Sequence, residues 1–479
     1  MKRIVLYPSP GMGHLIAMVE FGKFVLSRRP SLSVTVLTAT FPFNTGSTAE
    51  YIAEVSSSVP SITFHRLPFV SPLRDLSSYT NGEHLTLDIL RLCKPHVHDA
   101  LRSLSLSSAV SAFIIDMFCT QTLPGAASLG IPTYFFYTCS ASYLLVALRL
   151  PILHRTTTES FRHLHGTIFQ VPGLPPFPAT SMPLPLLDRN TEVYDEIVEI
   201  AAMMPNADGI IVNTFTSLEP KAVQALASEI NIGDMPTPAI YCTGPLIMSS
   251  DKSGGAGGGS GMHECLTWLD SQPSRRVVFL CFGSLGVFSA EQLKEIATGL
   301  EISGQRFLWV VRSPPTGDRS KRFSPPPDPD LDLLLPNGFL DRTKDRGMVV
   351  KSWAPQVAVL SHESVGGFVT HCGWNSVLEA VCAGVPMVAW PLYAGQRFNK
   401  IMLVEEMKVA LPINESEGGF VNSAEVAGRV KQIIDSAEGE EVRKRVVEMS
   451  NEAKVALSEA GSSRVALAKL FEQWKRTTA

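Results

Sequence analysis

Short apolar runs alternate with longer amphipathic stretches through the first half of the chain. Such runs, bounded by Gly, Pro or polar residues, are typical of buried strands. They are Ile4–Tyr7, Val34–Leu37, Ile62–Phe64, Ala112–Phe118, Thr133–Tyr137, Ile210–Val212 and Ile240–Cys242. Helical periodicity lies between most of them, the longest over roughly His84–Leu104. Strands alternating with helices predict an α/β fold with a doubly wound parallel sheet.

The same pattern restarts in the second half, after a Gly/Ser-rich segment at Ser249–Gly261 that cannot pack a core. The later apolar runs are Val277–Phe282, Phe307–Val311, Met348–Val350, Gly367–Thr370 and Pro386–Trp390. We therefore expect a domain over residues 1–245, a flexible loop over 246–262 and a second α/β domain over 263–455. A last helical pattern covers about Glu440–Gln473, and Pro314–Pro336 is expected to be an exposed loop.

Composition excludes several classes of protein. The net charge of −4 over 479 residues gives no basic footprint for nucleic acid. The eight cysteines lie mostly in apolar runs without a CxxC or Cys/His cluster, which indicates reduced thiols in a cytoplasmic protein and no metal site. Prolines and glycines break the N-terminal apolar run too early for a signal peptide, and no apolar run reaches 18 residues. We expect no integral membrane segment.

The stretch Trp353–Gln396 carries the most chemistry. Its apolar run Val365–Thr370 predicts a strand, which a His-Cys-Gly turn follows. Asn375 and Ser376, both N-cap residues, then open a helical pattern. A strand, a glycine turn and a helix start together form a phosphate site, to which His371 could donate. Glu379 lies one helical turn after Asn375, where a carboxylate can accept from ribose hydroxyls.

This stretch of 44 residues closely resembles the signature box of the plant secondary-product UDP-glycosyltransferases, and the likeness extends over essentially the whole chain. The resemblance implies the GT-B architecture, two Rossmann-like doubly wound domains facing a cleft, with the C-terminal helix, residues 456–479, packing back on the N-terminal domain. It assigns donor-binding roles to Trp353 and Ala354 (uracil), Gln356 and Glu379 (ribose), His371, Gly373, Asn375 and Ser376 (diphosphate), and Trp374, Gly395 and Gln396 (sugar). Gly395 departs from the family pattern, which usually has Asp or Glu there.

His14 follows a Gly-Met-Gly turn at the end of the first strand. A dinucleotide fingerprint would need a third glycine, and position 16 is Ile. A histidine that merely caps the turn is the alternative, but the resemblance makes His14 the general base, with Asp116 as the group that orients it. From the residues alone, Asp116 could equally be a buried carboxylate satisfied by backbone N–H groups. Parallel topology brings the two strand ends to one edge of the sheet.

Three further features complete the prediction. The resemblance places Ser284 at the diphosphate and Thr138 near the sugar, and leaves His362 structural. Asp328, Asp330 and Asp332 form a DxD pattern inside a Pro-rich loop rather than at a strand end. We therefore expect no metal and no cofactor, with UDP-glucose as co-substrate.

The function expected is inverting transfer of glucose from UDP-glucose to a phenolic acceptor of the flavonoid or chalcone type, by a monomer. Trp374 stands where flavonoid glucuronosyltransferases have Arg, and Gln396 is the residue that accompanies glucose. A sugar-nucleotide epimerase of the same architecture would lack the box, and an inactive binding protein would lack His14 or Asp116. The acceptor, the hydroxyl used, and O- or C-attachment cannot be inferred from these residues.

Overall fold

A computed structural model describes residues 2–40, 47–79, 81–228, 236–248, 263–315, 317, 323–324 and 326–476. The chain divides into two compact units, which are treated separately below. The N-terminal unit comprises Met1–Ile247 and Ala453–Ala479, and the C-terminal unit comprises Met248–Glu452. The Gly/Ser-rich segment Ser249–Gly261 lies outside the described residues.

The described part of the N-terminal unit is built on a parallel sheet of order β3-β2-β1-β4-β5-β8-β9. Its strands are β1 (Arg3–Tyr7), β2 (Ser33–Thr38), β3 (Ile62–Arg66), β4 (Val110–Asp116), β5 (Thr133–Tyr137), β8 (Gly209–Val212) and β9 (Ile240–Cys242). Every residue of β4 and β5 is buried, as expected for a parallel sheet with helices on both faces. Leu6 pairs with Val36 on one side and with Ile114 on the other.

Strand β4 is shorter at its end than the run Ala112–Phe118 predicts. It stops at Asp116, whose carboxylate accepts a hydrogen bond from the backbone N–H of Phe118 at 3.2 Å. This contact caps a 3-10 helix, Met117–Thr122, so the apolar residues after Asp116 leave the sheet. A two-stranded antiparallel ribbon, β6 (Ile168–Phe169) and β7 (Phe177–Pro178), was not predicted, because strands of two residues carry no periodicity.

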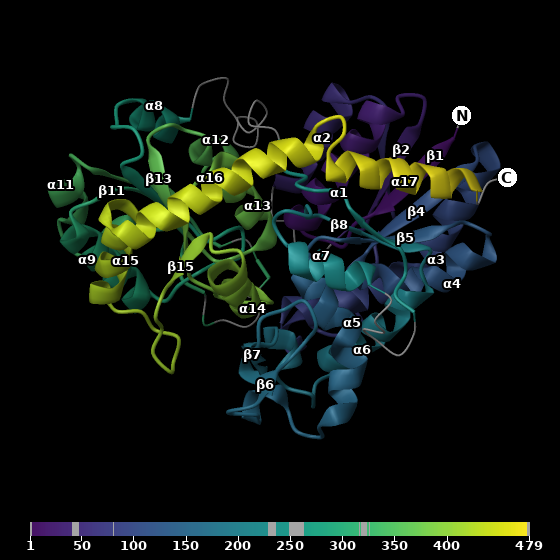
Figure 1. Ribbon diagram of the computed structural model, residues 1–479, viewed down its shortest axis with the longest axis horizontal. Helices are drawn as coiled ribbons and strands as arrows, with labels where there is room; N and C mark the ends of the chain where they lie inside the picture. Colours follow the sequence, from purple (N-terminus) through teal and green to yellow (C-terminus); the bar gives the residue numbers. More distant parts are fainter. Residues whose placement is uncertain are drawn as a thin grey trace. The chain divides into compact units, whose positions relative to one another are not determined.

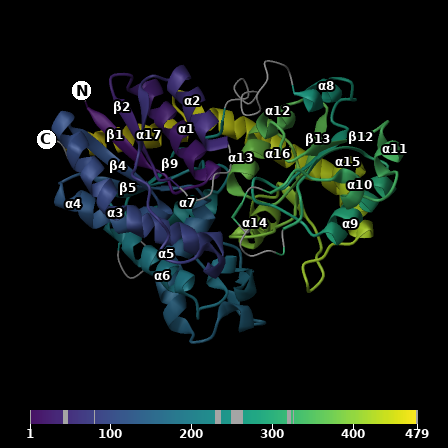
Figure 2. The same ribbon diagram turned by 180° about the vertical axis from the view of Figure 1, so that it is seen from behind.

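Helices cover both faces of this sheet (Figures 1 and 2). They are α1 (Met12–Arg28), α2 (Ser47–Ser58), α3 (Gly82–Ser107), α4 (Leu123–Ser128), α5 (Ala141–Thr156), α6 (Glu192–Met203), α7 (Pro220–Ala227) and α17 (Ser462–Arg476). Helix α3 begins where the Asn81 side chain accepts from the N–H of His84 at 2.8 Å. Helix α1 begins after Gly11, whose φ of 123° favours glycine.

The described part of the C-terminal unit repeats the arrangement with the strand order β12-β11-β10-β13-β14-β15. Its strands are β10 (Val277–Cys281), β11 (Arg306–Val311), β12 (Gly347–Lys351), β13 (Val365–Thr370), β14 (Met387–Ala389) and β15 (Ala410–Pro412). Strand β15 was not predicted, since it has three residues and ends on proline. Trp309 and Trp390 fill the core, and the rings of Phe279 and Phe368 stack across β10 and β13.

The helices of the C-terminal unit include a pair, α9 and α15, that pack on each other beside the sheet (Figure 1). They are α8 (Glu264–Asp270), α9 (Ala290–Ser303), α10 (Leu331–Leu334), α11 (Phe339–Thr343), α12 (Gln356–Leu360), α13 (Trp374–Ala383), α14 (Gln396–Ile401), α15 (Ser423–Asp435) and α16 (Ala437–Leu457), whose last residues join the N-terminal unit. Helix α10 lies inside the segment expected to be a loop, part of which is outside the described residues.

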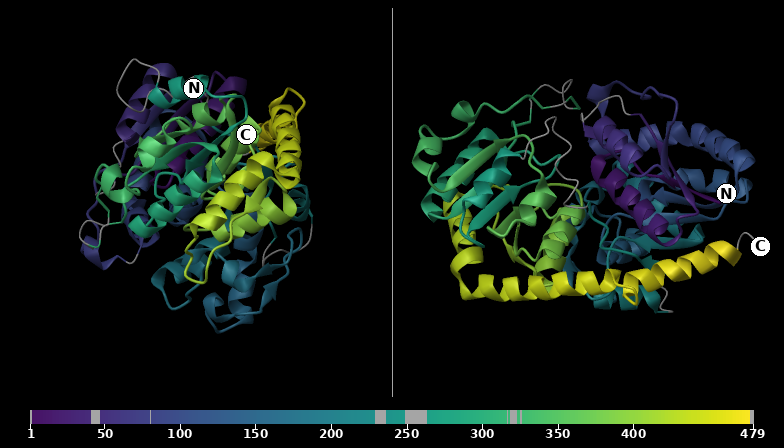
Figure 3. Two further views of the ribbon diagram at one scale, coloured as in Figure 1. Left: turned by 90° about the vertical axis from the view of Figure 1, so that its left-hand side faces the viewer. Right: turned by 90° about the horizontal axis from the view of Figure 1, so that it is seen from above.

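The last helical pattern is two helices rather than one. Helix α16 ends at Leu457 and α17 begins at Ser462. Gly461 lies in the turn, where a Cβ would come within 2.1 Å of the Val455 carbonyl oxygen. Helix α17 then packs against β9 and β4 within the N-terminal unit (Figure 3), with the Trp474 ring 6.3 Å from that of Tyr134. Within the described residues, no helix is both long and apolar enough to cross a bilayer.

Candidate active site

Each sheet reverses its strand order at one point, between β1 and β4 in the N-terminal unit and between β10 and β13 in the C-terminal unit. Connections leave such a point in opposite directions, so the loops after the two strands part and leave a crevice at their carboxyl ends. Ligands of open α/β sheets bind there. The predicted catalytic pair and part of the predicted donor site lie at these two points.

His14 and Asp116 meet at the N-terminal reversal point. His14 lies in the first turn of α1, just after β1, and Asp116 is the last residue of β4. The distance between His14 Nδ1 and Asp116 Oδ2 is 2.7 Å. Asp116 is completely buried, whereas the His14 side chain keeps 27% of its surface exposed. Asp116 thus combines both roles considered from the sequence, since it also accepts from a backbone N–H.

The contact with Asp116 determines which nitrogen of the His14 ring carries the hydrogen. A carboxylate accepts only, so Nδ1 carries a hydrogen toward Asp116, and Nε2 is the acceptor of neutral His14. Burial lowers the pKa of His14, but the charge of Asp116 and its hydrogen bond together outweigh burial, so the pKa is raised above its ordinary value. An imidazole of this kind can take a proton at Nε2 while Asp116 stabilises the resulting cation.

Thr138 joins this pair. Its hydroxyl lies 3.2 Å from His14 Nδ1, on the loop between β5 and α5. Sequence reasoning missed the group that holds this loop, Glu219. Its buried carboxylate accepts from the N–H groups of Ala141 and Ser142, both at 2.9 Å, at the start of α5. In the sequence, Glu219 is only an acidic residue before Pro220, which starts α7. Nothing in that pattern indicates that its carboxylate binds the start of α5.

His371 occupies the C-terminal reversal point, directly after β13. Its ring is 6% exposed, and burial lowers its pKa to about 4, so it is neutral at physiological pH. A Cβ at Gly283 or Gly373 would come within 2.7 or 2.4 Å of this ring, so both positions need glycine. Nδ1 of His371 is buried and has no hydrogen-bond partner among the described residues. An orphaned buried polar atom of this kind points to a ligand.

Helix α13 starts one residue earlier than Asn375, which corrects the prediction that Asn375 and Ser376 cap it. Gly373 is the N-cap, and no side chain bonds to the first turn from that position. The glycine is required by the His371 ring, so a side-chain cap could not be accommodated there. Trp374 is the first helical residue and is 5% exposed. A helix N-terminus capped in this way favours an anion through its N–H groups and dipole.

Gln356, the first residue of α12, contacts Glu379 of α13. The Gln356 amide donates to Glu379 Oε2 at 2.6 Å and to the Ser376 hydroxyl at 2.9 Å. Burial raises the pKa of Glu379 to about 7, against the lowering effect of the Gln356 hydrogen bond. Such a carboxylate gains from additional donors, which vicinal hydroxyls supply.

Trp353 follows β12 with 40% of its surface exposed, while Ala354 beside it is 4% exposed. One edge of the Trp353 ring packs on His263, whose ring centroid is 5.7 Å away. A large, partly exposed aromatic ring suits stacking on a flat base.

Gln396 and Gly395 begin α14. The Gln396 carbonyl oxygen accepts from the N–H groups of Leu392 and Tyr393, at 2.8 and 2.9 Å. Both lone pairs of this oxygen are used by these two N–H groups, so the NH₂ group remains for a ligand. Gly395 has φ −87° and ψ 12°, which residues other than glycine adopt readily. Ser284 is exposed, next to Gly283 after β10.

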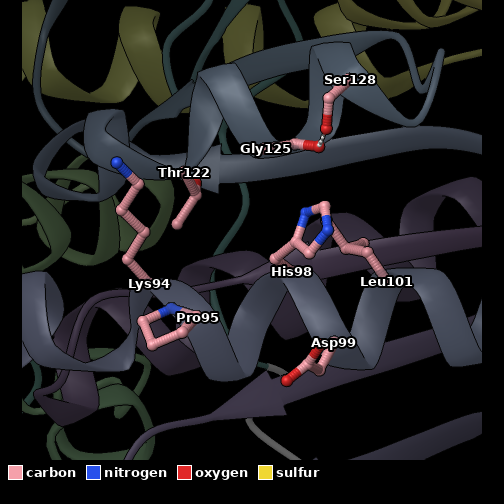
Figure 4. A pocket seen from close by; sticks show the side chains of 8 residues that line it. All are labelled: Lys94, Pro95, His98, Asp99, Leu101, Thr122, Gly125 and Ser128. Carbon is pink, nitrogen blue, oxygen red and sulfur yellow. Dashed lines mark hydrogen bonds between the residues drawn. The ribbon is translucent and has the colours of Figure 1, made fainter.

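The aspartates of the DxD pattern and His362 were also considered from the sequence, and those described next make local structural contacts. Asp328 contacts Lys351 and Ser352, and Asp330 caps α10. His362 bonds to Asp270 and Ser364, so it is structural. No cluster of three or more potential metal ligands occurs among the described residues. A hollow of about 310 Å³ lies between α3 and the segment Thr122–Ser128, lined by Lys94, His98 and Asp99 among others (Figure 4), but none of the predicted site residues lines it.

Known proteins resemble the chain along its whole length. The family model described as UDP-glucoronosyl and UDP-glucosyl transferase matches residues 258–451. Anthocyanidin 5,3-O-glucosyltransferase of a Rosa hybrid cultivar is 48% identical, covering 99% of each chain. Phloretin 2'-O-glucosyltransferase of Pyrus communis is 49% identical, covering 96% of this chain and 97% of its own.

Solved structures agree. Phytolacca americana UGT2 complexed with UDP-2-fluoro-glucose and pterostilbene matches with a TM-score of 0.86 and 40% identity, over 99% of this chain and 100% of that one. The Polygonum tinctorium UDP-glucosyltransferase capable of glucosylating indoxyl matches with a TM-score of 0.88 and 36% identity, over 99% of each chain. The fold is GT-B, and the chain belongs to the UDP-glycosyltransferase family of enzymes.

Proposed function

We propose that the protein transfers glucose from UDP-glucose to a hydroxyl of a flavonoid-type phenol, with inversion at C1. The observation that carries the proposal is the 2.7 Å contact between His14 Nδ1 and Asp116 Oδ2, which leaves Nε2 of His14 as a base. Relatives that are 48% and 49% identical are named for anthocyanidin and phloretin as acceptors, which supports the acceptor class. The N-terminal unit would bind the acceptor and the C-terminal unit the UDP-sugar.

In the proposed reaction the acceptor O–H gives its proton to His14 Nε2, and the oxygen forms a bond to C1 of the sugar. The bond between C1 and the β-phosphate oxygen breaks, and its electron pair leaves with UDP. Asp116 stabilises the imidazolium that forms. The charge on the leaving diphosphate is taken up by the N-terminus of α13 and by neutral His371, which donates a hydrogen bond.

Glucose is proposed over glucuronate because Trp374 cannot form the bidentate pair that an arginine offers a carboxylate. Gln396 supports this assignment because its carbonyl oxygen is occupied by two backbone N–H groups and its NH₂ group can donate to a sugar hydroxyl. The cytoplasmic site of action rests on eight free cysteines, all of them described. We also propose that the enzyme acts as a monomer.

The test is a product assay with UDP-glucose or UDP-glucuronate and a panel of flavonoid phenols, read by mass and by the anomeric proton coupling. We expect a hexose addition of β configuration, and a higher kcat/KM for UDP-glucose. An α-linked product would contradict inversion. A preference for UDP-glucuronate would overturn the donor assignment, and no transfer to any phenol would overturn the acceptor class.

A further inference from the structure

Arg312 lies at the carboxyl edge of the C-terminal sheet and has no assigned role. It directly follows β11, which lies between β12 and β10 in the sheet. The loop after β12 carries Trp353, and the loop after β10 carries Ser284. Arg312 therefore follows the strand between the proposed base-stacking residue and a proposed phosphate contact.

The guanidinium of Arg312 has no anionic partner among the described residues. Its Nε is buried with no hydrogen-bond partner in that part of the chain, and Nη1 makes one long contact of 3.4 Å with the Ser352 carbonyl oxygen. No carboxylate of the described residues lies within ion-pair distance of it, whereas Arg342 in the same unit pairs with Glu301 at 2.5 Å. Burial lowers the pKa of Arg312, but an arginine stays charged in proteins. A partly buried cation without a counter-ion is costly unless a ligand supplies one.

The groups around Arg312 connect it to the phosphate region. The Cys281 thiol at the end of β10 and the Tyr393 hydroxyl lie close enough to Arg312 that ionisation of either would raise its pKa. The ring of Tyr393 lies 5.8 Å from that of His371, measured between centroids. Arg312 thus lies near the same loop that faces His371, whose Nδ1 is also buried without a partner.

We propose that Arg312 binds the diphosphate of the UDP-sugar and neutralises the charge that develops on the leaving UDP. The proposal rests on the proposed donor site at His371 and α13. It adds the positive side chain that this site otherwise lacks, because His371 is neutral. Guanidinium groups recognise phosphate oxygens through two parallel hydrogen bonds, which lysine cannot reproduce.

A structural role is the competing explanation. Ser352 has a positive φ of 62°, and the contact from Arg312 could serve only to hold this turn and the Trp353 that follows. The two explanations differ in the part of the nucleotide that they affect. Loss of a diphosphate contact weakens UDP and spares uridine, whereas a displaced Trp353 weakens both.

The experiment measures dissociation constants for UDP and uridine by calorimetry, at low and high salt, for the wild type, Arg312→Gln, Arg312→Lys and His371→Ala. Arg306→Gln is the matched control, because Arg306 begins the same strand at its opposite end and bonds to Gln272. We expect Arg312→Gln to weaken UDP about 10- to 100-fold with uridine unchanged. Arg312→Lys should fall between, and UDP binding by Arg312→Gln should depend less on salt than that of the wild type.

Equal weakening of UDP and uridine by Arg312→Gln would overturn the proposal in favour of the turn. Weakening of UDP by His371→Ala but not by Arg312→Gln would overturn it while leaving the donor site intact. Unchanged UDP binding in both variants would remove the donor site as well. Thermal unfolding of each variant confirms that the comparison is made on folded protein.

Discussion

Each unit places a histidine at its strand-reversal point, and the two histidines have opposite electrostatic surroundings. His14 follows β1 and faces a fully buried carboxylate at 2.7 Å, which raises its pKa. His371 follows β13 and is held between two glycine positions, with burial lowering its pKa to about 4. One imidazole is prepared to gain a proton, and the other stays neutral and keeps a hydrogen-bonding atom for a ligand.

The two histidines differ in their surroundings because the neighbouring strand at each reversal point ends in a different residue. Strand β4 ends in Asp116, beside the loop that carries His14, whereas β10 ends in Cys281 and continues to Gly283 beside His371. In the proposed mechanism, the carboxylate makes the first reversal point a site for proton transfer. Glycines make the second a site where a ligand can approach the backbone closely. We therefore propose different chemistry at the two reversal points, and four tests distinguish them.

The largest effect is expected at the N-terminal reversal point. His14→Ala should lower kcat by about 10²- to 10⁴-fold, the usual contribution of a general base. UDP binding should be unchanged, because His14 belongs to the proton-transfer site. Asp116→Asn should also lower kcat strongly, since an amide can favour the wrong tautomer of His14. Steady-state kinetics with a weakly acidic phenol and UDP calorimetry measure both quantities. Near-wild-type turnover of His14→Ala would contradict the assignment of the base.

His371→Ala should produce the reverse pattern. We expect UDP binding to weaken about 10- to 100-fold, since a hydrogen bond to a charged group is lost. Binding of uridine, which has no phosphate, should be unchanged. The wild-type dependence of UDP binding on pH should show no titration of His371 above pH 5, because its pKa is about 4. A loss of uridine binding equal to that of UDP would show that His371 supports the pocket rather than the diphosphate.

We expect Glu379 to make nucleotide binding depend on pH near 7, where His371 does not titrate. Burial raises the pKa of its carboxyl to about 7, and ribose hydroxyls donate best to the ionised form. Uridine should therefore bind more weakly as the pH falls through 7, by about 10-fold between pH 8 and pH 6, in proportion to the ionised fraction. Uridine is the probe because UDP titrates its own phosphate. Glu379→Gln is the control, and the pH dependence should disappear in this variant.

Sequence reasoning identified most strands of both sheets because parallel strands are buried on both faces and form continuous apolar runs. It missed β15 and the ribbon β6–β7, whose strands have two or three residues and carry too little pattern. It also placed the start of α13 at Asn375, because Asn and Ser are common caps, whereas the His371 ring enforces glycine at the cap.

The site was harder to predict where a contact depends on tertiary packing. The strand-end positions of His14 and Asp116 could be predicted from parallel topology. Three features depend on distant segments: the contact between Thr138 and His14, the bonds from Glu219 to the start of α5, and the lack of a partner for Arg312 Nε among the described residues. Single residues of these types have no periodicity, so no local pattern distinguishes them from surface positions.

The smallest effect is expected at Gly395, where the family usually has Asp or Glu. The Gln396 carbonyl accepts two backbone N–H groups, so this residue offers no acceptor to a sugar hydroxyl. The φ of −87° at Gly395 allows any residue, which indicates that the backbone does not require glycine. Gly395→Asp should therefore raise kcat/KM for UDP-glucose about 2- to 10-fold, the value of one net hydrogen bond. Donor kinetics with one acceptor measure the change, and UDP alone should bind equally to both proteins.

Gly395→Asn is the matched control, because its amide keeps an acceptor oxygen without the charge. Lower efficiency in both folded variants would show that the sugar pocket is adapted to Gly395, since the added side chain would then occupy space that the sugar needs.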